Sequence, residues 1–420
     1  MKTFSPLKII FLLSIFMLSL TSISDTDAFT HLSLGREIIK TLGFPLTEQF
    51  NHTSLDKPFG YPEWLFGVII YSVYLILGSA GVVIFKAGVI TFTYFILFKD
   101  SELQTMSSQA EFLTGSDKSD PYKNCRGLIY QARYLIAVIF LFLIAIFARG
   151  RFVERPEILS NLFLVFTIFS LNQFFYNGRR YIYFIPLVFI LWANTHPSII
   201  IGLYPFIAFI IGGAIQSFFN KYEHQQWNRL KIITLILFAS ILCTLINPYT
   251  YNILFAPKGL AANIWRYEVV ELAPANWEAY KPLYIFIGII FVSFIFNLRQ
   301  SIINIILILP FVAISTSAIR FIPLIGIIGA PIVVRNISNL KFQISNFKLL
   351  LLKIFVSIYI VILTIATLAN IGPFKNYENT FGISINASSL PEGALEYLHK
   401  NNIQGRIFNT FHFGGYITFK

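Results

Sequence analysis

The stretch LLLLKIFVSIYIVILTIATLAN at residues 349–370 decides the fold class of this chain. Apart from Lys353 it carries no charge, and as an α-helix its roughly 22 residues would reach about 33 Å. That length crosses the hydrocarbon core of a bilayer, which is about 30 Å thick. Because lipid offers the backbone no hydrogen-bond partner, such a segment must be helical. We therefore predict a transmembrane helix here.

Similar apolar blocks recur along the whole chain. Hydrophobic residues make up 56% of the 420 positions and charged residues only 12%, against about 25% in a soluble domain. We expect an all-α, polytopic membrane protein with about eleven transmembrane helices. Together with 349–370, the predicted spans are 8–24, 80–98, 132–148, 157–176, 181–196, 199–216, 231–247, 283–297, 301–316 and 321–334.

Two segments near the N-terminus allow other assignments. Residues 64–78 are apolar but would reach only about 22 Å as a helix. We place them as a re-entrant or juxtamembrane helix, because counting them as a span would reverse the side of every later loop. Residues 1–24 also fit a cleaved signal peptide, and Asp25 begins outside in both cases.

The distribution of charge predicts the topology. The net charge of +12 comes from basic residues in short loops rather than from a continuous patch, so we expect no nucleic-acid partner. The positive-inside rule places the N-terminus in the cytoplasm and the C-terminus outside. Residues 149–155, with three arginines in a predicted outer loop, depart from the rule. The loops predicted to lie inside contain Arg179, Arg180, Lys221, Arg229, Lys231, Arg335, Lys341 and Lys348.

Residues 1–370 form the predicted transmembrane domain. It has a large extracytoplasmic loop at 25–79, a second outer loop at 248–282, and a polar, flexible cytoplasmic insertion at 99–131. Residues 371–420 read as the start of an extracytoplasmic α/β domain, with a helix over 391–401 and two strands flanking His412. Two strands do not make a sheet, so we interpret the tail as truncated. The cysteines, Cys125 and Cys243, provide neither a disulfide framework nor a thiolate metal site.

Two carboxylates follow the first predicted span in the sequence DTDAFTH at 25–31. Carboxylate oxygens coordinate divalent cations such as magnesium or manganese, and a single carboxylate can act as a general base. Asp25, Asp27 and His31 are therefore candidate catalytic residues, and the two acids are a candidate cation site. The alternative is structural, with Asp25 capping an interfacial helix predicted over 29–42 and both acids marking the membrane interface.

Seven further residues are candidate contacts to a substrate. Lys86 lies in the apolar run VVIFKAGVI at 82–90, where a charge is costly and indicates a function by default, although snorkelling to the headgroups is an alternative. Trp192, Asn194 and His196 lie at a predicted helix break, where they can hydrogen-bond a sugar or pyrophosphate, with a simple tight turn as the alternative. The remaining candidates, beside or within predicted outer loops, are Glu63, Glu271 and Arg320.

Taken in order, these residues resemble a known pattern. Its parts are D-x-D-x-x-x-H-L-x-x-G-R-x-I at 25–38, P-E-W-L at 62–65, R-P-E at 155–157, W-A-N-x-H at 192–196, N-P-Y at 247–249, the region of Glu271, R-F-I-P at 320–323, and R-I-F-N with G-G-Y near the end. Apart from 99–131, nearly the whole chain resembles a group of bacterial membrane proteins. That group is similar to the GT-C glycosyltransferases, relatives of protein mannosyltransferases and lipid A aminoarabinose transferases.

The resemblance implies a polyprenyl-phosphate-linked sugar as donor and a glycan, lipid or protein as acceptor. Transfer would take place on the extracytoplasmic side of the inner membrane, by a single displacement. The resemblance assigns the general base to Asp27, or less directly to Asp25, with Lys86, Arg320 or a cation stabilising the departing phosphate. We also expect one cavity at the outer face, lined by Asp27, His31, Trp192, His196 and Glu271.

Two other functions compete with the transferase hypothesis. A non-enzymatic transporter or flippase for a lipid-linked glycan would need a polar path through the membrane, which the predicted spans hardly provide. A structural scaffold of the envelope would need no pocket.

Overall fold

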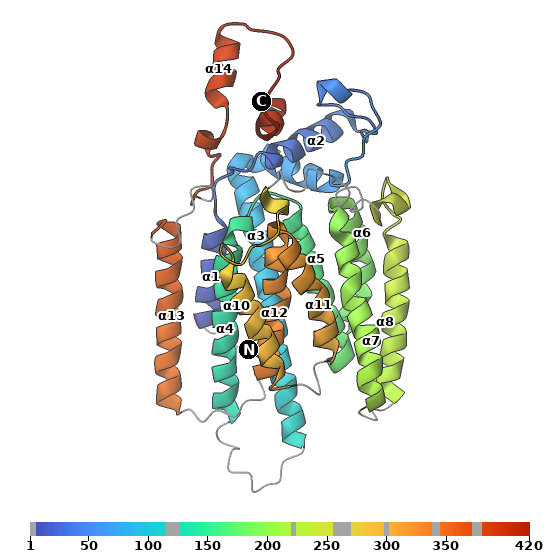
Figure 1. Cartoon of the computed structure of the whole chain (residues 1–420), viewed down its shortest axis with the longest axis vertical. Coiled ribbons are helices and arrows are strands. Elements are labelled where there is room, and N and C mark those ends of the chain that lie inside the picture. The colour runs from blue at the N-terminus through green and yellow to red at the C-terminus, as the bar shows by residue number, and fades with distance from the viewer. Residues whose placement is uncertain are drawn as a thin grey trace.

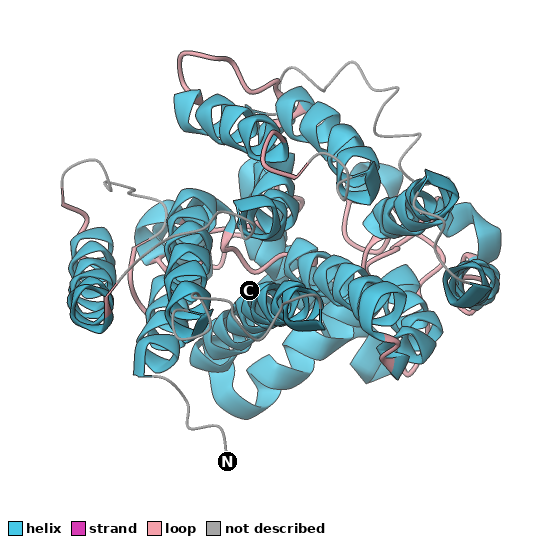
Figure 2. Cartoon of the chain, turned by 90° about the horizontal axis from the view of Figure 1, so that it is seen from below, coloured by secondary structure: helices cyan, strands magenta, loops and turns pink. Residues whose placement is uncertain are grey.

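The computed structural model describes residues 6–114, 126–219, 224–254, 270–297, 302–337, 345–371 and 380–420. Over these ranges the chain consists of α-helices, short 3-10 turns and loops, and isolated bridges are its only β-type pairings (Figure 2). The predicted all-α architecture is confirmed for this part of the chain.

The main helices run between two ends of a bundle (Figure 1). Their bounds are α1 Pro6–Ser19, α3 Trp64–Thr114, α4 Arg126–Ala148, α5 Glu157–Asn177, α6 Ile185–Thr195, α7 Leu203–Phe219, α8 His224–Cys243, α10 Lys281–Phe294, α11 Ile302–Ser317, α12 Ile322–Ile337 and α13 Asn346–Leu368.

Seven described segments are long and apolar enough to cross a membrane, which makes this a membrane protein by length and composition. They are Trp64–Leu103, Tyr134–Arg151, Glu157–Asn177, Pro197–Phe218, Gln225–Cys243, Ile319–Ile337 and Asn346–Leu368. Helices α1, α10 and α11 are apolar but shorter, and α6 has only 11 residues. The larger number of about eleven spans remains a prediction.

The predicted short helix 64–78 and the predicted span 80–98 are parts of one interrupted helix, α3. The interruption is at Gly78, whose φ of 62° lies in the left-handed region. The part before Gly78 packs against α2, Asp27–Thr41, where Gly35 approaches Gly67 so closely that a Cβ on Gly35 would lie 2.1 Å from the Gly67 carbonyl oxygen. Beyond residue 98, α3 continues to Thr114, into the predicted insertion, of which 115–125 lie outside the described residues.

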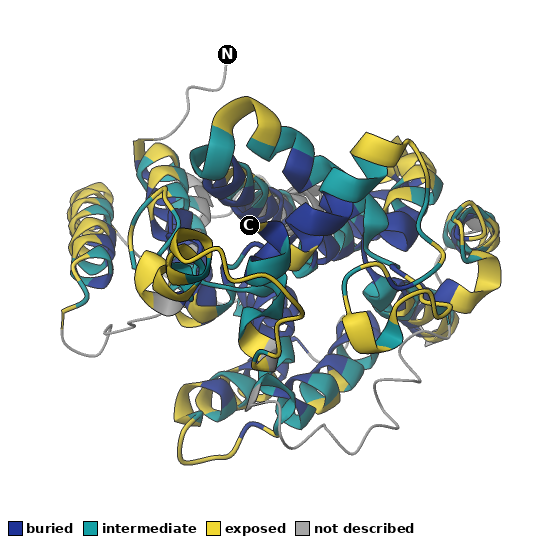
Figure 3. Cartoon of the chain, turned by 90° about the horizontal axis from the view of Figure 1, so that it is seen from above, coloured by how far each residue is buried: buried dark blue, intermediate teal, exposed yellow. Residues whose placement is uncertain are grey.

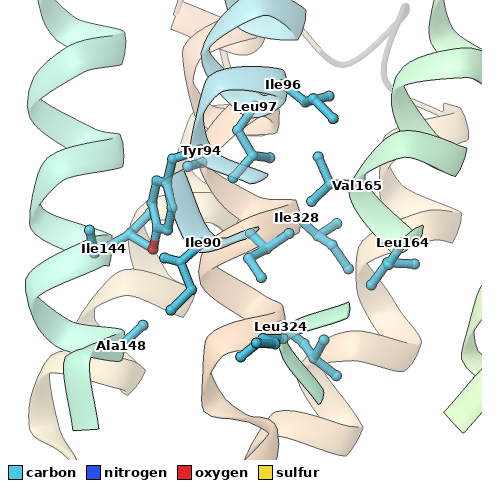
Figure 4. Close-up of a cluster of buried hydrophobic side chains, with 14 of the residues drawn as sticks. Ile90, Tyr94, Ile96, Leu97, Ile144, Ala148, Leu164, Val165, Leu324 and Ile328 are labelled. Carbon is cyan, nitrogen blue, oxygen red and sulfur yellow. The ribbon is translucent and has the colours of Figure 1, made fainter. Parts of the chain in front are cut away.

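The core of the bundle lies between α3, α4, α5 and α12 (Figure 4). Tyr94 and Leu97 of α3 face Ile144 of α4, Val165 of α5 and Ile328 of α12, all of them buried. Seen from above, buried surface concentrates in the middle of the bundle, whereas α13 stands at its edge (Figure 3). Small residues permit close helix contacts, as expected in a membrane: a Cβ on Gly326 of α12 would lie 2.5 Å from Ile144.

One end of the bundle carries α2, the connections that follow α1 and α4, and the C-terminal tail (Figure 1), and we call it the loop end. Residues 21–23 of the first connection bridge to Phe381 and Ile385 of the tail. The described segments predicted to lie outside gather at this end. The Arg179–Arg180 turn after α5 lies at the opposite end.

The tail differs in part from the prediction. The helix expected over 391–401 is present as α14, Glu392–Lys400, but the strands expected around His412 are absent from the described tail. The prediction was wrong for residues 416–419, which were expected in a strand and belong to the short helix α15, Gly414–Phe419. The reason is packing: Tyr416 and Phe419, three residues apart on one helix face, both contact the ring of Phe29 on α2.

Candidate functional site

Three arginines converge at the loop end, each placed by a short turn beside a helix end. Arg151 closes the 3-10 turn Arg149–Arg151 after α4, and Arg320 lies in the 3-10 turn Ile319–Phe321 before α12. Arg155 lies in the connection just before α5, where Pro156 takes the N-cap position and fixes the start of that helix. These tight connections hold the guanidinium groups near one another.

Arg155 is the centre of the cluster, and its partners are far apart in the sequence. It donates two hydrogen bonds to Asp25, 130 residues away, and two to Glu271 at 2.8 and 3.0 Å. A third carboxylate, that of Asp27, lies 3.0 Å from its Nη2. Burial alone would lower the pKa of Arg155, but its bond to Asp25 and the three carboxylates raise that pKa. Arg155 is therefore a permanent cation that joins the first outer loop to α5.

Glu271 lies in the 3-10 turn Val270–Leu272, and its carboxylate lies among the three arginines. Arg151 Nη1 donates to its carboxylate at 2.6 Å, Arg155 donates to both oxygens, and Arg320 Nη1 is 4.0 Å away. Burial would raise the pKa of Glu271, but Arg155 and Arg151 outweigh that effect and lower it. Glu157, at the start of α5, accepts a hydrogen bond from Arg320 and lies 3.8 Å from Arg151.

The two acids of the D-x-D sequence differ in their surroundings. The Asp25 side chain is 10% exposed and bonds Arg155 through both oxygens, whereas the Asp27 side chain is 46% exposed. Partial burial raises the pKa of Asp27, with Arg155 opposing the shift and Asp25 reinforcing it. Asp27 is thus the more accessible of the two carboxylates.

The candidate cation site at Asp25 and Asp27 does not fit this arrangement. Both carboxylates point to the Arg155 guanidinium, which already supplies the positive charge that a cation would bring. Among the described residues there is no group of three or more His, Cys, Asp or Glu side chains suited to hold a metal ion. The expectation of a magnesium or manganese site is therefore not supported by the donor set.

A small cavity lies beneath the arginines, and we call it the arginine pocket. Its volume is about 40 Å³, which is room for water but not for a sugar. Its floor is apolar, with Ile158, Leu164, Ile201 and Leu324. The polar and aromatic residues of its lining include Arg151, Arg155, Glu157, Ser160, Asn161, Trp192, His196, Ser198 and Arg320.

The expected shared cavity is thus only partly realised. Trp192 and His196 line the arginine pocket, as does the candidate anion contact Arg320. Asp27, His31 and Glu271 do not belong to its lining, although Asp27 and Glu271 reach it through their bonds to Arg155.

The first outer loop and residues 192–196 meet directly. The Trp64 indole donates to Asn194 Oδ1 at 3.0 Å, and Glu63 Oε1 lies 3.8 Å from His196 Nε2. Asn194 Nδ2 in turn donates to the Ile246 carbonyl, so that Asn194 ties the loop to the end of α8. Burial raises the pKa of Glu63 to about 8, with the nearby Glu157 carboxylate adding to the shift and Arg320 opposing it.

Two of the candidate residues, Lys86 and His31, are buried and contact other residues of the protein. Lys86 is 1% exposed and uses its ammonium group on the Thr21 carbonyl at 2.9 Å, Thr21 Oγ1 at 2.6 Å and Glu154 Oε1 at 2.5 Å. An ammonium has three donors, so none remains for a phosphate in this state. His31 is buried edge-on against the Phe66 ring, and burial lowers its pKa to about 4, which leaves it neutral.

No family model, curated protein or solved structure matches this chain. The GT-C resemblance therefore rests on the quoted residues alone.

Several residues of the site were not among the candidates taken from the sequence. Arg151, Arg155 and Glu157 lie in the stretch RGRFVERPE at 149–157, and Ser160 and Ser198 line the pocket beside them. The sequence held two signals: Arg155 and Glu157 belong to the R-P-E of the quoted pattern, and residues 149–155 place three arginines in a predicted outer loop, where the positive-inside rule disfavours them. A local exception to that rule indicates a specific use of the charge.

Proposed function

We propose that this protein is a membrane glycosyltransferase that moves a sugar from a polyprenyl-phosphate donor to an acceptor at the loop end of the bundle. One observation carries the proposal: Arg151, Arg155 and Arg320 converge above an apolar floor at the end of the membrane helices. Guanidinium groups bind phosphate with two parallel hydrogen bonds, and an apolar floor suits the first isoprene units.

The proposed reaction is a single displacement. An acceptor hydroxyl oxygen forms a bond to the anomeric carbon of the sugar, the bond from that carbon to the phosphate oxygen breaks, and the polyprenyl phosphate leaves with the electron pair. The arginines stabilise the negative charge that develops on the leaving phosphate. Because the Glu271 carboxylate takes the hydrogen bonds of Arg151 and Arg155, the donor phosphate must displace it, and the pocket, too small for a sugar, must widen as the donor binds.

The proposal includes a topology. The shorter helices α1, α6, α10 and α11 would also cross the membrane, giving eleven spans with α3, α4, α5, α7, α8, α12 and α13. The loop end would then face the outside of the inner membrane, and the N-terminus would face the cytoplasm. The short basic turns at the opposite end support this orientation.

The test is whether the purified protein consumes a radiolabelled polyprenyl-phosphate sugar and releases polyprenyl phosphate. We expect turnover by the wild type and a loss of about 10²- to 10³-fold in Arg320→Gln, because one charge-stabilising donor is removed. Arg406→Gln, on the exposed tail, is the matched control and should leave the rate unchanged. If the wild type neither turns over the donor nor binds polyprenyl phosphate, the proposal is wrong.

One observation favours the competing transporter hypothesis. Asp100, Asn172 and Asn304 are buried around a second cavity between α3, α5, α11 and α12, and Asn172 donates to Asp100 at 3.0 Å. Buried polar residues that line a cavity between helices can form part of a transport path. A flippase would move a fluorescent lipid-linked glycan across proteoliposomes without cleaving it, and a transferase would cleave it.

A further inference from the structure

A row of polar groups runs along one wall of the arginine pocket. Glu63 Oε1 lies 3.8 Å from His196 Nε2, and the other ring nitrogen, Nδ1, lies 2.6 Å from Ser198 Oγ. The Ser198 hydroxyl donates to Ser160 Oγ at 3.0 Å, and the Trp192 indole donates to Ser160 Oγ at 3.1 Å and to Ser198 Oγ at 3.3 Å. A carboxyl, an imidazole and two hydroxyls therefore follow one another, and His196, Ser198 and Ser160 all line the pocket.

The hydrogen bonds assign the tautomer of His196. The backbone N–H of Ser198 donates to His196 Nδ1 at 3.2 Å, so Nδ1 carries a lone pair and the ring proton belongs on Nε2. Nε2 faces Glu63, while the Ser198 hydroxyl faces the basic nitrogen at 2.6 Å. This order of acid, imidazole and hydroxyl is the one by which imidazoles activate hydroxyl groups.

A structural role explains only part of this arrangement. His196 accepts the Ser198 N–H and thereby caps the 3-10 turn Pro197–Gly202. Capping does not require a carboxyl beside Nε2, nor hydroxyls that open into the pocket. Asp27, by comparison, is bonded to Arg155 and lies outside the pocket lining.

We propose that Glu63, His196 and Ser198 form the proton-accepting unit of the pocket, which takes the proton from the acceptor hydroxyl. This inference rests on the proposed function. As the acceptor oxygen bonds to the sugar carbon, its proton passes to Ser198 Oγ while the Ser198 proton passes to His196 Nδ1. Ser198 ends unchanged and His196 ends as an imidazolium. Burial lowers the pKa of His196 to about 4, so the imidazolium depends on the ionised form of the Glu63 carboxylate beside it. The electron pair of the broken sugar bond leaves with the phosphate.

The first test does not need the transfer reaction. A serine whose proton is drawn to a neutral imidazole reacts with a fluorophosphonate probe. The probe enters by the same widening of the pocket that the donor requires, and we expect the purified full-length protein to be labelled at Ser198. Ser198→Ala should abolish labelling, and Ser357→Ala on α13, whose hydroxyl donates to the Lys353 carbonyl, should leave it unchanged.

The decisive variant is His196→Asn, because asparagine is a good N-cap but not a base. We expect it to keep the melting temperature of the wild type while losing labelling. If His196→Asn is labelled like the wild type, or if the wild type is not labelled at all, His196 serves only as a cap and the inference is overturned.

Transfer activity gives the second test. Given a donor that the wild type turns over, His196→Asn should lose about 10²- to 10⁴-fold in kcat with unchanged binding of polyprenyl phosphate, a larger loss in kcat than that of Asp27→Asn. If Asp27→Asn instead loses more activity than His196→Asn, Asp27 is the general base and the inference is overturned. A wild type that is labelled at Ser198 but turns over no donor would contradict the proposed function alone.

Discussion

Among single residues, Glu271 competes most directly with an incoming phosphate. Its carboxylate takes the hydrogen bonds of Arg151 and Arg155 that the phosphate would need. Glu271→Gln keeps the size of the side chain and removes its charge. We expect the variant to bind a short-chain prenyl phosphate about tenfold more tightly, since charges about 4 Å apart near a protein surface interact by about 1–4 kcal/mol.

The measurement for Glu271 is a titration of the purified protein with the prenyl phosphate, in which binding is monitored by the shift in melting temperature. Glu396→Gln removes an exposed acid on α14 and is the matched control. Equal or weaker binding by Glu271→Gln would show that the Glu271 carboxylate does not occupy the phosphate site.

The pKa of a second residue, Glu63, predicts how activity depends on pH. Its pKa of about 8 means that the carboxyl is protonated at pH 7 and ionised above pH 8. The ionised form stabilises an imidazolium at His196, so kcat should rise between pH 7 and 9. The charged or titratable groups that act on Glu63 are His196, Glu157, Arg320, Asp27 and Arg155.

The pH profile of Glu63→Gln should be flat over the same range, because the variant cannot ionise there. Glu37→Gln, an acid on α2 outside the arginine pocket, should keep the rise. A rise of the same size in Glu63→Gln would assign the titration to another group.

At the scale of elements, the buried pair of Lys86 and Glu154 fixes the connection that carries Arg155. Lys86 lies on α3, Glu154 precedes Arg155, and both side chains are at most 2% exposed. Lys86→Met leaves a buried carboxylate without its partner, which costs about 3–5 kcal/mol. We expect a clearly lower melting temperature in detergent.

The double variant Lys86→Met/Glu154→Leu removes both charges and should recover most of the loss, because a buried pair replaced by apolar side chains is often neutral. Lys99→Met breaks a pair with Glu102 that is partly exposed and should have little effect. If the single and double variants melt alike, the pair does not hold the connection in place.

The same elements show what the sequence could predict. Segments such as 157–176 and 349–370 match α5 and α13 closely, because an apolar run of spanning length allows only one structure in lipid. The tail helix α15 was missed because its stability comes from contacts of Tyr416 and Phe419 with Phe29, almost 400 residues earlier in the chain. Local pattern carries no information about such a contact.

The candidate site, too, could be predicted from the sequence only in part. Asp25, Asp27, Glu271 and Arg320 were visible as polar residues in predicted outer loops, but the pairing of the three acids with Arg155 was not. The R-P-E sequence at 155–157 and the excess of arginine at 149–155 marked Arg155 as unusual, but only the folded chain brings residues 25, 155 and 271 together. The partners of Lys86 were hidden for the same reason.

For the whole molecule, the orientation in the membrane is the prediction on which the location of the reaction depends. Lys400 on α14 is exposed at the loop end, and Arg180 is exposed in the turn after α5 at the opposite end (Figure 1). In a background with Cys125 and Cys243 replaced by serine, we expect Lys400→Cys to react with a membrane-impermeant maleimide in cells whose outer barrier is opened. Arg180→Cys should react only after the inner membrane is also permeabilised, because the short basic turns lie in the cytoplasm. The two positions control for each other, since both are exposed and both must be labelled in detergent. Labelling of Arg180→Cys alone in intact inner membranes would place the arginine pocket in the cytoplasm, where the proposed extracytoplasmic transfer could not occur.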